Sequence, residues 1–274
     1  MTTQAPSKAG RKRATAGKTA AAKPAASKRR PSGLSAATIR TMFERFRASE
    51  PEPKGELEHV NVFTLLVAVV LSAQATDAGV NKATRALFAR ITTPAQMVAL
   101  GEERLIEHIK TIGLFRAKAK NVIKLSERLI ADRCGEVPAD RNYLESLPGV
   151  GRKTANVVMN MAFGQPTMAV DTHVFRVANR TGMAPGKDPL AVEAALLEVV
   201  PAEFGLHAHH WLILHGRYHC LARKPQCPTC IIKDLCAFDE TTGEMTAAVT
   251  AAPRKPATAR SKSKTSNAKR ARAG

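Results

Sequence analysis

The sequence has few long apolar runs and few aromatic residues. Its one long apolar run, Val62–Leu71, is interrupted by Thr64 and is too short for the ~20 residues of a membrane-spanning helix. With one Trp, two Tyr and nine Phe in 274 residues, a surface of interleaved aromatic rings that stacks on nucleotide bases is not expected. No apolar segment follows the N-terminus, so we expect no secretory signal.

Acidic residues are scarce at both ends of the chain, which carries a net charge of +19. Residues 1–34 hold nine basic and no acidic residues, and residues 240–274 hold eight basic and two acidic ones. Both ends are rich in Ala, Lys, Arg, Pro and Ser, so we expect disordered tails that bind nucleic acid loosely. The alternatives are a solubility tail or, for the first segment, an organellar transit peptide.

Between these tails, the apolar residues recur with helical spacing. Ser35 is predicted to cap a helix with Ile39, Met42 and Phe46 on one face. Cap signals of the same kind predict further helix starts at Asn61, Thr76, Thr93-Pro94, Asp171 and Asp188-Pro189. The run Val62–Leu71 reads as a wholly buried helix. We find no convincing strand and no repeat, which predicts an all-α fold.

The segment Leu144–Val158, LESLPGVGRKTANVV, predicts a helix, a tight turn and a second helix. Gly149 and Gly151 allow the turn to adopt positive φ and to approach a ligand closely. The second helix begins with free N–H groups at its positive dipole end. In a basic protein, such a turn predicts a binding site for nucleic-acid phosphate.

Lys153 lies in the first turn of that second helix, where the macrodipole disfavours a cation. It is either a solvated lysine that contacts phosphate or a nucleophilic amine. A Schiff-base lysine needs a pKa near ~7–8, against ~10.4 normally, a shift worth about 4 kcal/mol. The dipole supplies only ~0.3–1 kcal/mol, so a nucleophilic Lys153 requires desolvation in a pocket.

Asp171 lies between an apolar segment and a helix start in AVDTHVF, where an N-cap is the plain interpretation. A catalytic role requires Asp171 to lie near Lys153. An anion there raises the pKa of an amine, so Asp171 would act by accepting a proton or by stabilising positive charge on a sugar. One residue can do both.

Four of the five cysteines fall within seventeen residues with the spacing C-x6-C-x2-C-x5-C, at Cys220, Cys227, Cys230 and Cys236. A zinc site usually has two short C-x2–4-C pairs, and only one is present, so an iron–sulfur cluster is favoured over zinc. Cys134 stands apart and is expected to be a buried, inert thiol. The five histidines between residues 207 and 219 are expected mainly to pack and to cap.

These motifs together resemble the endonuclease III family of bacterial DNA glycosylases with AP-lyase activity. The resemblance covers roughly residues 35–238 and rests on LSAQATD at 71–77, LPGVGRKTAN at 147–156, VDTHVFRV at 170–177, HHWLILHGRYHC at 209–220 and the cysteine spacing. It implies a two-lobed, all-α helix-hairpin-helix glycosylase fold. The implied parts are a six-helix bundle at 55–165 with the hairpin at about 140–162, a cluster lobe at 35–54 and 166–239, and the tails 1–34 and 240–274.

The resemblance also implies a base-excision repair enzyme that removes oxidised pyrimidines from duplex DNA and cleaves the AP site 3′ by β-elimination. Lys153 would be the nucleophile and Asp171 its assistant. The implied DNA contacts are Gln74, Ile112, Leu114, Gly149, Val150, Gly151 and Arg152. The four clustered cysteines would hold a [4Fe-4S] cluster, and the protein would be a cytoplasmic, DNA-associated monomer. The alternatives are a monofunctional glycosylase of the same superfamily and a non-enzymatic DNA-binding protein.

Overall fold

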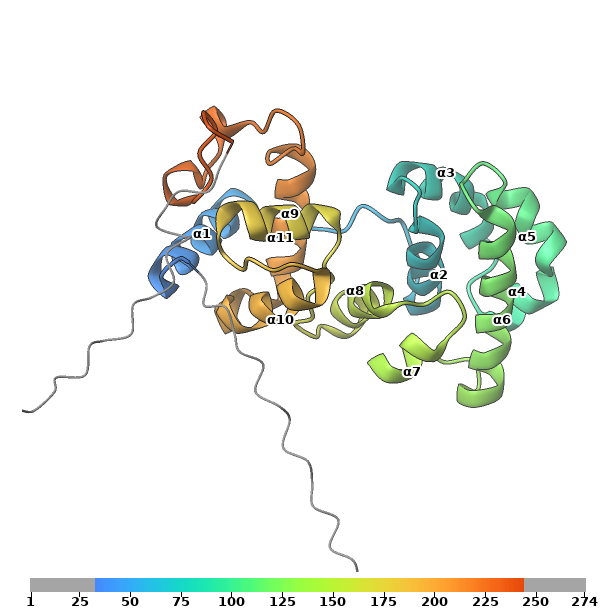
Figure 1. Ribbon diagram of the computed structural model, residues 1–274. Helices are drawn as coiled ribbons and strands as arrows, with labels where there is room; N and C mark the ends of the chain where they lie inside the picture. The colour runs from blue at the N-terminus through green and yellow to red at the C-terminus, as the bar shows by residue number, and fades with distance from the viewer. Residues whose placement is uncertain (1–32, 244–274) are drawn as a thin grey trace, which may run out of the picture.

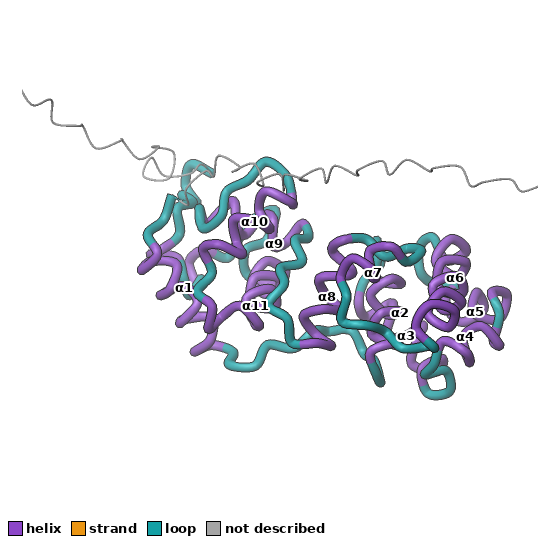
Figure 2. Tube along the Cα trace, turned by 90° about the horizontal axis from the view of Figure 1, so that it is seen from below, coloured by secondary structure: helices purple, strands orange, loops and turns teal. Residues whose placement is uncertain are grey.

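The computed structural model describes residues 33–243, and these form two groups of helices with α8 between them (Figure 1). Within this range every regular element is helical, as Figure 2 shows, and no strand is present. The all-α prediction is therefore confirmed. The two tails predicted to be disordered lie almost entirely outside the described residues.

The first lobe is the sequence-continuous group around α2, whose residues Phe63–Leu71 are all buried, as predicted. The remaining helices pack around it and bury a core that includes Leu105, Leu125 and Val158. The helices of this lobe are α2 (Val62–Ser72), α3 (Asp77–Phe88), α4 (Pro94–Leu100), α5 (Glu102–Ile109), α6 (Phe115–Arg133), α7 (Arg141–Ser146) and α8 (Arg152–Phe163).

The second lobe joins the N-terminal helix to the C-terminal half of the described chain. Its core includes Phe43, Phe204 and Trp211, whose rings lie 5.7–6.2 Å apart. Its helices are α1 (Ala36–Ser49), α9 (Thr172–Thr181), α10 (Pro189–Val199) and α11 (Gly205–Tyr218), with short 3₁₀ turns η1 (Ala202–Phe204), η2 (Cys227–Thr229) and η3 (Lys233–Leu235). The predicted lobe boundaries after residues 54 and 165 stay a prediction, and both fall in segments that join the two cores.

Local capping sets most helix ends as the sequence predicts. Asn61 and Thr93 form reciprocal capping boxes with Thr64 and Gln96, and Asp188 caps α10. The expectation for Cys134 is wrong. Cys134 is exposed, because it ends α6 in a left-handed conformation, φ 51°, and so lies beyond the last turn that packs on the core.

Two chain segments connect the lobes, residues 50–61 and residues 164–171. The second segment is short and links the end of α8 directly to the start of α9, so the helix-hairpin-helix of one lobe faces the first turn of α9 in the other. None of the helices in residues 33–243 combines the length and the apolar character needed to cross a bilayer.

Candidate active site between the two lobes

The hairpin before α8 presents free backbone N–H groups. Gly151 is the N-cap of α8 and no side chain caps this helix, so the first-turn amides have no partner within the helix. Gly149 has φ +77°, and a Cβ there would lie 2.9 Å from Nδ2 of Asn121. Only glycine fits this position without strain. The predicted anion-binding turn is thus available in geometry and in hydrogen-bonding capacity.

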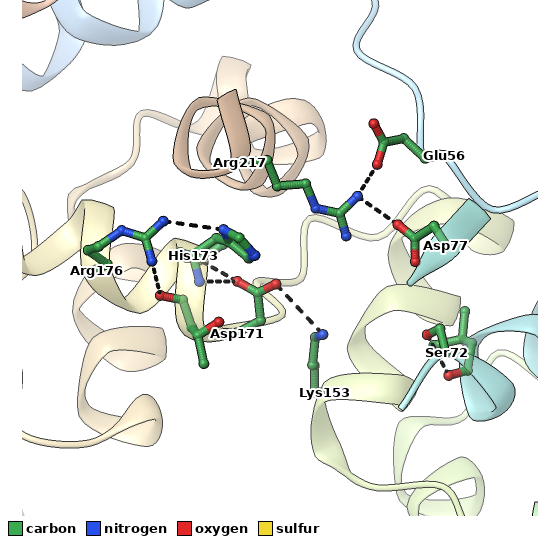
Figure 3. A network of polar contacts seen from close by, with 11 residues as sticks. Glu56, Ser72, Asp77, Lys153, Asp171, His173, Arg176 and Arg217 are labelled. Atoms are coloured by element: carbon green, nitrogen blue, oxygen red, sulfur yellow. Dashed lines mark hydrogen bonds and ion pairs between the residues drawn. The ribbon is translucent and has the colours of Figure 1, made fainter. Parts of the chain in front are cut away.

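Lys153 and Asp171 meet across the lobe interface, although they belong to different cores. Lys153 Nζ lies 3.8 Å from Asp171 Oδ2, as Figure 3 shows. The other carboxylate oxygen, Oδ1, accepts the N–H groups of His173 and Val174 at 2.9 and 2.8 Å. Asp171 is therefore the predicted N-cap of α9, and the cap fixes the carboxylate so that its second oxygen faces the amine.

The Lys153 side chain is 52% exposed, whereas that of Asp171 is only 11% exposed. The protein alone therefore does not supply the desolvation that the sequence argument requires for a nucleophilic lysine. A bound duplex that covers the hairpin would bury the amine. The exposed amine of Lys153 thus lies next to the nearly buried carboxylate of Asp171.

A cavity of about 70 Å³ opens beside Lys153, and its lining contains residues that the sequence argument did not select. His209 and Arg217 contribute from α11, Asp77 from the first turn of α3, and Glu56 from the linker. Arg217 donates from Nη1 to Asp77 Oδ2 at 2.6 Å and also to Glu56. His209, Arg217 and Asp77 lie within the quoted motifs, whereas Glu56 lies outside them. The i, i+4, i+8 spacing of residues 209, 213 and 217 places them on one face of α11.

His209 is a deeply buried residue of this cavity. Burial, and then the neighbouring ring of His210, lower the pKa of His209 to about 3. The imidazole is therefore neutral at physiological pH, and its Nδ1 has no hydrogen-bond partner. His209, His210 and His215 are all buried, which confirms the packing role expected for most of the histidines.

Arg152, a predicted DNA contact, forms an ion pair between the two lobes. Its Nε and Nη2 donate to the two carboxylate oxygens of Glu193 on α10, at 2.8 and 2.9 Å. Glu193 is 6% exposed and also accepts from Nδ2 of the buried Asn156. This network joins the first turns of α8 to α10. A contact of Arg152 with DNA therefore rests on its backbone amide and stays a prediction.

Two of the predicted DNA contacts lie on exposed turns with left-handed backbones. Gln74 has φ 54° and Leu114 has φ 59°, conformations that cost energy for residues with a Cβ. Leu114 is 60% exposed, whereas Ile112 is 5% exposed and belongs to the core of the first lobe. Leu114 is thus placed to reach a duplex, with Ile112 packed in the core behind it. Contact of Ile112 with DNA stays a prediction.

The four clustered cysteines surround a second cavity, of about 290 Å³. Within residues 33–243, no group of three His, Cys, Asp or Glu side chains is close enough to hold a single metal ion. The sulfur atoms instead line a space larger than one ion requires, which suits a multi-iron cluster. Arg180 donates to the Cys220 sulfur at 3.5 Å, and its guanidinium also stacks on the ring of Phe238.

Burial affects the acidity of these thiols. It raises the pKa of the Cys236 thiol to about 11, and it also raises the pKa values of Cys227 and Cys230. These side chains are therefore neutral at physiological pH unless a metal centre displaces the protons. The donor set and the cavity fit an iron–sulfur cluster.

Comparisons with known proteins agree with this geometry. Residues 67–202 match the model of the HhH-GPD superfamily of base excision DNA repair proteins. The chain is 60% identical over 199 residues to endonuclease III of Escherichia coli K12, and 58% identical over 198 residues to that of Treponema pallidum. These matches cover 73% and 72% of this chain and 94% of each relative.

Solved structures show the same likeness. A trapped endonuclease III–DNA covalent intermediate and a non-covalent endonuclease III–DNA complex each share 49% identity with this chain, at a TM-score of 0.70. They cover 74% of this chain, and 96% and 95% of their own chains are matched. A thermostable thymine-DNA glycosylase, 24% identical with a TM-score of 0.67, shares the fold.

Proposed function

Because this chain belongs to the endonuclease III family, it is a base-excision repair DNA glycosylase and AP lyase, and we propose that Lys153 is its nucleophile. The placement of Lys153 Nζ 3.8 Å from Asp171 Oδ2 carries the proposal. The pair lies where two lobes meet and next to a hairpin with free amides. An amine, a fixed carboxylate and a phosphate-binding turn are the parts that an amine-based lyase needs.

The hairpin supports a binding step that is independent of base sequence. The N–H groups of Gly149, Gly151 and the first turn of α8 would hold backbone phosphates, whereas the Val150 N–H donates to the Leu147 carbonyl at 3.1 Å. Extruding a damaged base from the stack costs a few kcal/mol. Gln74 and Leu114, on turns at the edge of the same lobe, would fill the space that the base leaves. The expected substrates are duplexes that contain an oxidised pyrimidine or an AP site.

The covalent steps follow from the positions of the two catalytic residues. The lone pair of Lys153 Nζ attacks the sugar C1′, and the glycosidic bond breaks with its electrons passing to the departing base. Asp171 Oδ2 accepts a proton from the new ammonium or stabilises positive charge on the sugar. The C1′–O4′ bond then breaks as O4′ takes up a proton, which gives a Schiff base. Loss of a proton from C2′ breaks the C3′–O bond and releases the downstream strand with its 5′ phosphate, and hydrolysis of the Schiff base frees the lysine.

Cys220, Cys227, Cys230 and Cys236 would hold a [4Fe-4S] cluster in the sulfur-lined cavity. The bound cluster supplies a covalent cross-link for a loop that has only two short 3₁₀ turns, η2 and η3. The role proposed for the cluster is structural.

Borohydride trapping tests the nucleophile directly, because the reagent reduces a Schiff base to a stable amine. The substrate is a duplex with a single thymine glycol, and the enzymes are the wild type and Lys153→Ala. We expect a covalent protein–DNA adduct and strand cleavage with the wild type and neither with Lys153→Ala. Lys224→Ala, which removes a lysine from the cysteine loop, is the matched control and should still form the adduct.

An adduct that persists in Lys153→Ala would place the nucleophile elsewhere. A wild-type protein that releases the base without an adduct would instead be a monofunctional glycosylase. Binding without base release or cleavage would indicate a DNA-binding protein that performs no chemistry. Iron content is measured in every sample, so that cluster loss is not mistaken for loss of the nucleophile.

A further inference from the structure

Charged side chains other than the proposed catalytic pair line the cavity beside Lys153. Glu56 and Asp77 both line it, and they come from the linker and from α3 of the first lobe. Arg217 reaches them from α11 of the second lobe and donates to both through one nitrogen, Nη1. Figure 3 shows this guanidinium with its contacts to the carboxylates of Glu56 and Asp77.

Both carboxylates accept side-chain hydrogen bonds in this arrangement. Asp77 accepts from Arg217 at 2.6 Å, and the second oxygen of Glu56 accepts the hydroxyl proton of Tyr218. Burial lowers the pKa of Arg217, but the hydrogen bonds and charges of Asp77 and Glu56 outweigh this effect and raise it above the usual value. The guanidinium therefore stays charged at every pH at which the enzyme works.

Without that positive charge, two carboxylates would face the cavity of Lys153 unbalanced. Nearby anions favour the charged form of an amine, and a protonated amine cannot attack C1′. Among the remaining groups that line the cavity, His209 is neutral and burial also lowers the pKa of His210. Lys54 is an exposed cation, so its charge is screened by water and salt. The charged or titratable groups around Lys153 are Lys54, Glu56, Asp77, Asp171, His209, His210 and Arg217.

We propose that Arg217 is a positioning residue of the lyase reaction, whose positive charge offsets one of the two negative charges of Glu56 and Asp77 and so limits the negative charge that faces the amine. The arginine also ties the end of α11 to the start of α3, and so it holds the two lobes at the separation that brings Lys153 to Asp171. The inference rests on the proposed role of Lys153 as nucleophile.

The test is the pH dependence of AP-site cleavage under single-turnover conditions, with enzyme in excess of a duplex that carries a preformed AP site. This substrate bypasses base recognition, and saturating enzyme separates chemistry from DNA affinity. For Arg217→Met we expect the midpoint of the rate profile to move to higher pH by about one unit. The rate below the midpoint then falls about tenfold.

Three further variants test the direction in which the midpoint of the rate profile moves. Asp77→Asn removes one negative charge and leaves Arg217 and Glu56 as a neutral pair, so it should move the midpoint to lower pH. The double variant Asp77→Asn, Arg217→Met removes one charge of each sign, keeps the net charge of the wild-type cluster, and should return the midpoint to the wild-type value. Arg217→Lys keeps the charge and should stay close to the wild type.

Arg40→Met is the matched control, because it removes another arginine–carboxylate pair, with Glu203, inside the second lobe and away from the cavity. It should leave the profile unchanged. Circular dichroism and iron content show whether each variant is folded.

Two results would overturn the proposal, and they differ from each other. If the wild type cleaves the AP site and Arg217→Met shows an unshifted midpoint, at whatever rate, the arginine does not act through the charge of Glu56 and Asp77. If the wild type forms no Schiff base, the proposed nucleophile is wrong and this inference fails with it. A shift in Arg217→Met that the double variant Asp77→Asn, Arg217→Met reverses supports the proposal.

Discussion

Replacing Glu193 with alanine tests how Lys153, the proposed nucleophile, is held in position. Glu193 accepts two hydrogen bonds from Arg152 and one from Asn156, and the backbone of Arg152 adjoins Lys153. Removing one member of a fully buried ion pair costs roughly 3–5 kcal/mol. Here the side chain of Arg152 is 41% exposed and can turn to water, so the full value does not apply.

The remaining cost comes mainly from buried groups. Asn156 is fully buried and loses one acceptor, although its Nδ2 keeps the carbonyl of Met168 at 3.1 Å. A buried donor that is partly unsatisfied costs about 1–2 kcal/mol, and the lost packing adds to this. We expect Glu193→Ala to lower the free energy of unfolding by about 2 kcal/mol, which is about 4–8 °C in Tm for a domain of this size.

The AP-lyase rate of Glu193→Ala should fall by more than its loss of stability alone would cause. Glu193 fixes the first turn of α8 relative to α10, and a displacement of the nucleophile by ~1 Å can cost about 100-fold in rate. We expect the single-turnover AP-lyase rate of folded Glu193→Ala to drop about tenfold or more. Glu193→Gln keeps an acceptor for Asn156 and should lose about half as much stability.

The assays are thermal melting followed by circular dichroism and gel-based AP-site cleavage, with iron content matched between samples. Glu203→Ala is the control, because its pair with Arg40 is exposed on both sides and should contribute at most about 0.5 kcal/mol. A Glu193→Ala protein that melts within about 1 °C of the wild type and cleaves at the same rate would refute the reasoning.

Two further predictions concern His209 and the cysteine loop. The folded state lowers the pKa of His209 to about 3, so as the pH falls the unfolded chain takes up this proton before the folded protein does. The free energy of unfolding is therefore not reduced by this group above about pH 6.5, and it falls by up to about 1.4 kcal/mol per pH unit between pH 6.5 and 3. Melting curves of His209→Leu should show a smaller loss of stability over that range, and a loss equal to that of the wild type would contradict the low pKa of His209. Cys227→Ser should lose iron and visible absorbance, whereas Cys134→Ser, at the exposed end of α6, should keep both; a Cys227→Ser protein with full iron content would exclude that thiolate as a ligand.

The sequence by itself determined the helices and their ends. Caps at Asn61, Thr93 and Asp188 act through hydrogen bonds to residues two or three positions away, so local sequence predicts them well. The glycines of the hairpin and the cation at Lys153 are likewise visible as departures from the usual rules for a turn and a helix start. The order and spacing of the motifs then led to the family, and the cysteine spacing to a cluster.

Tertiary structure alone decided which of these residues meet. Arg217 and Asp77 lie 140 positions apart, and no periodicity relates them, because their contact depends on how two separate cores are set against each other. The same packing turns Arg152 from an exposed cation into the partner of Glu193, and buries Ile112 behind Leu114. Sequence rules act within about one helical turn, whereas Lys153, Asp171 and the charged residues around them come together only when both lobes are folded and packed against each other.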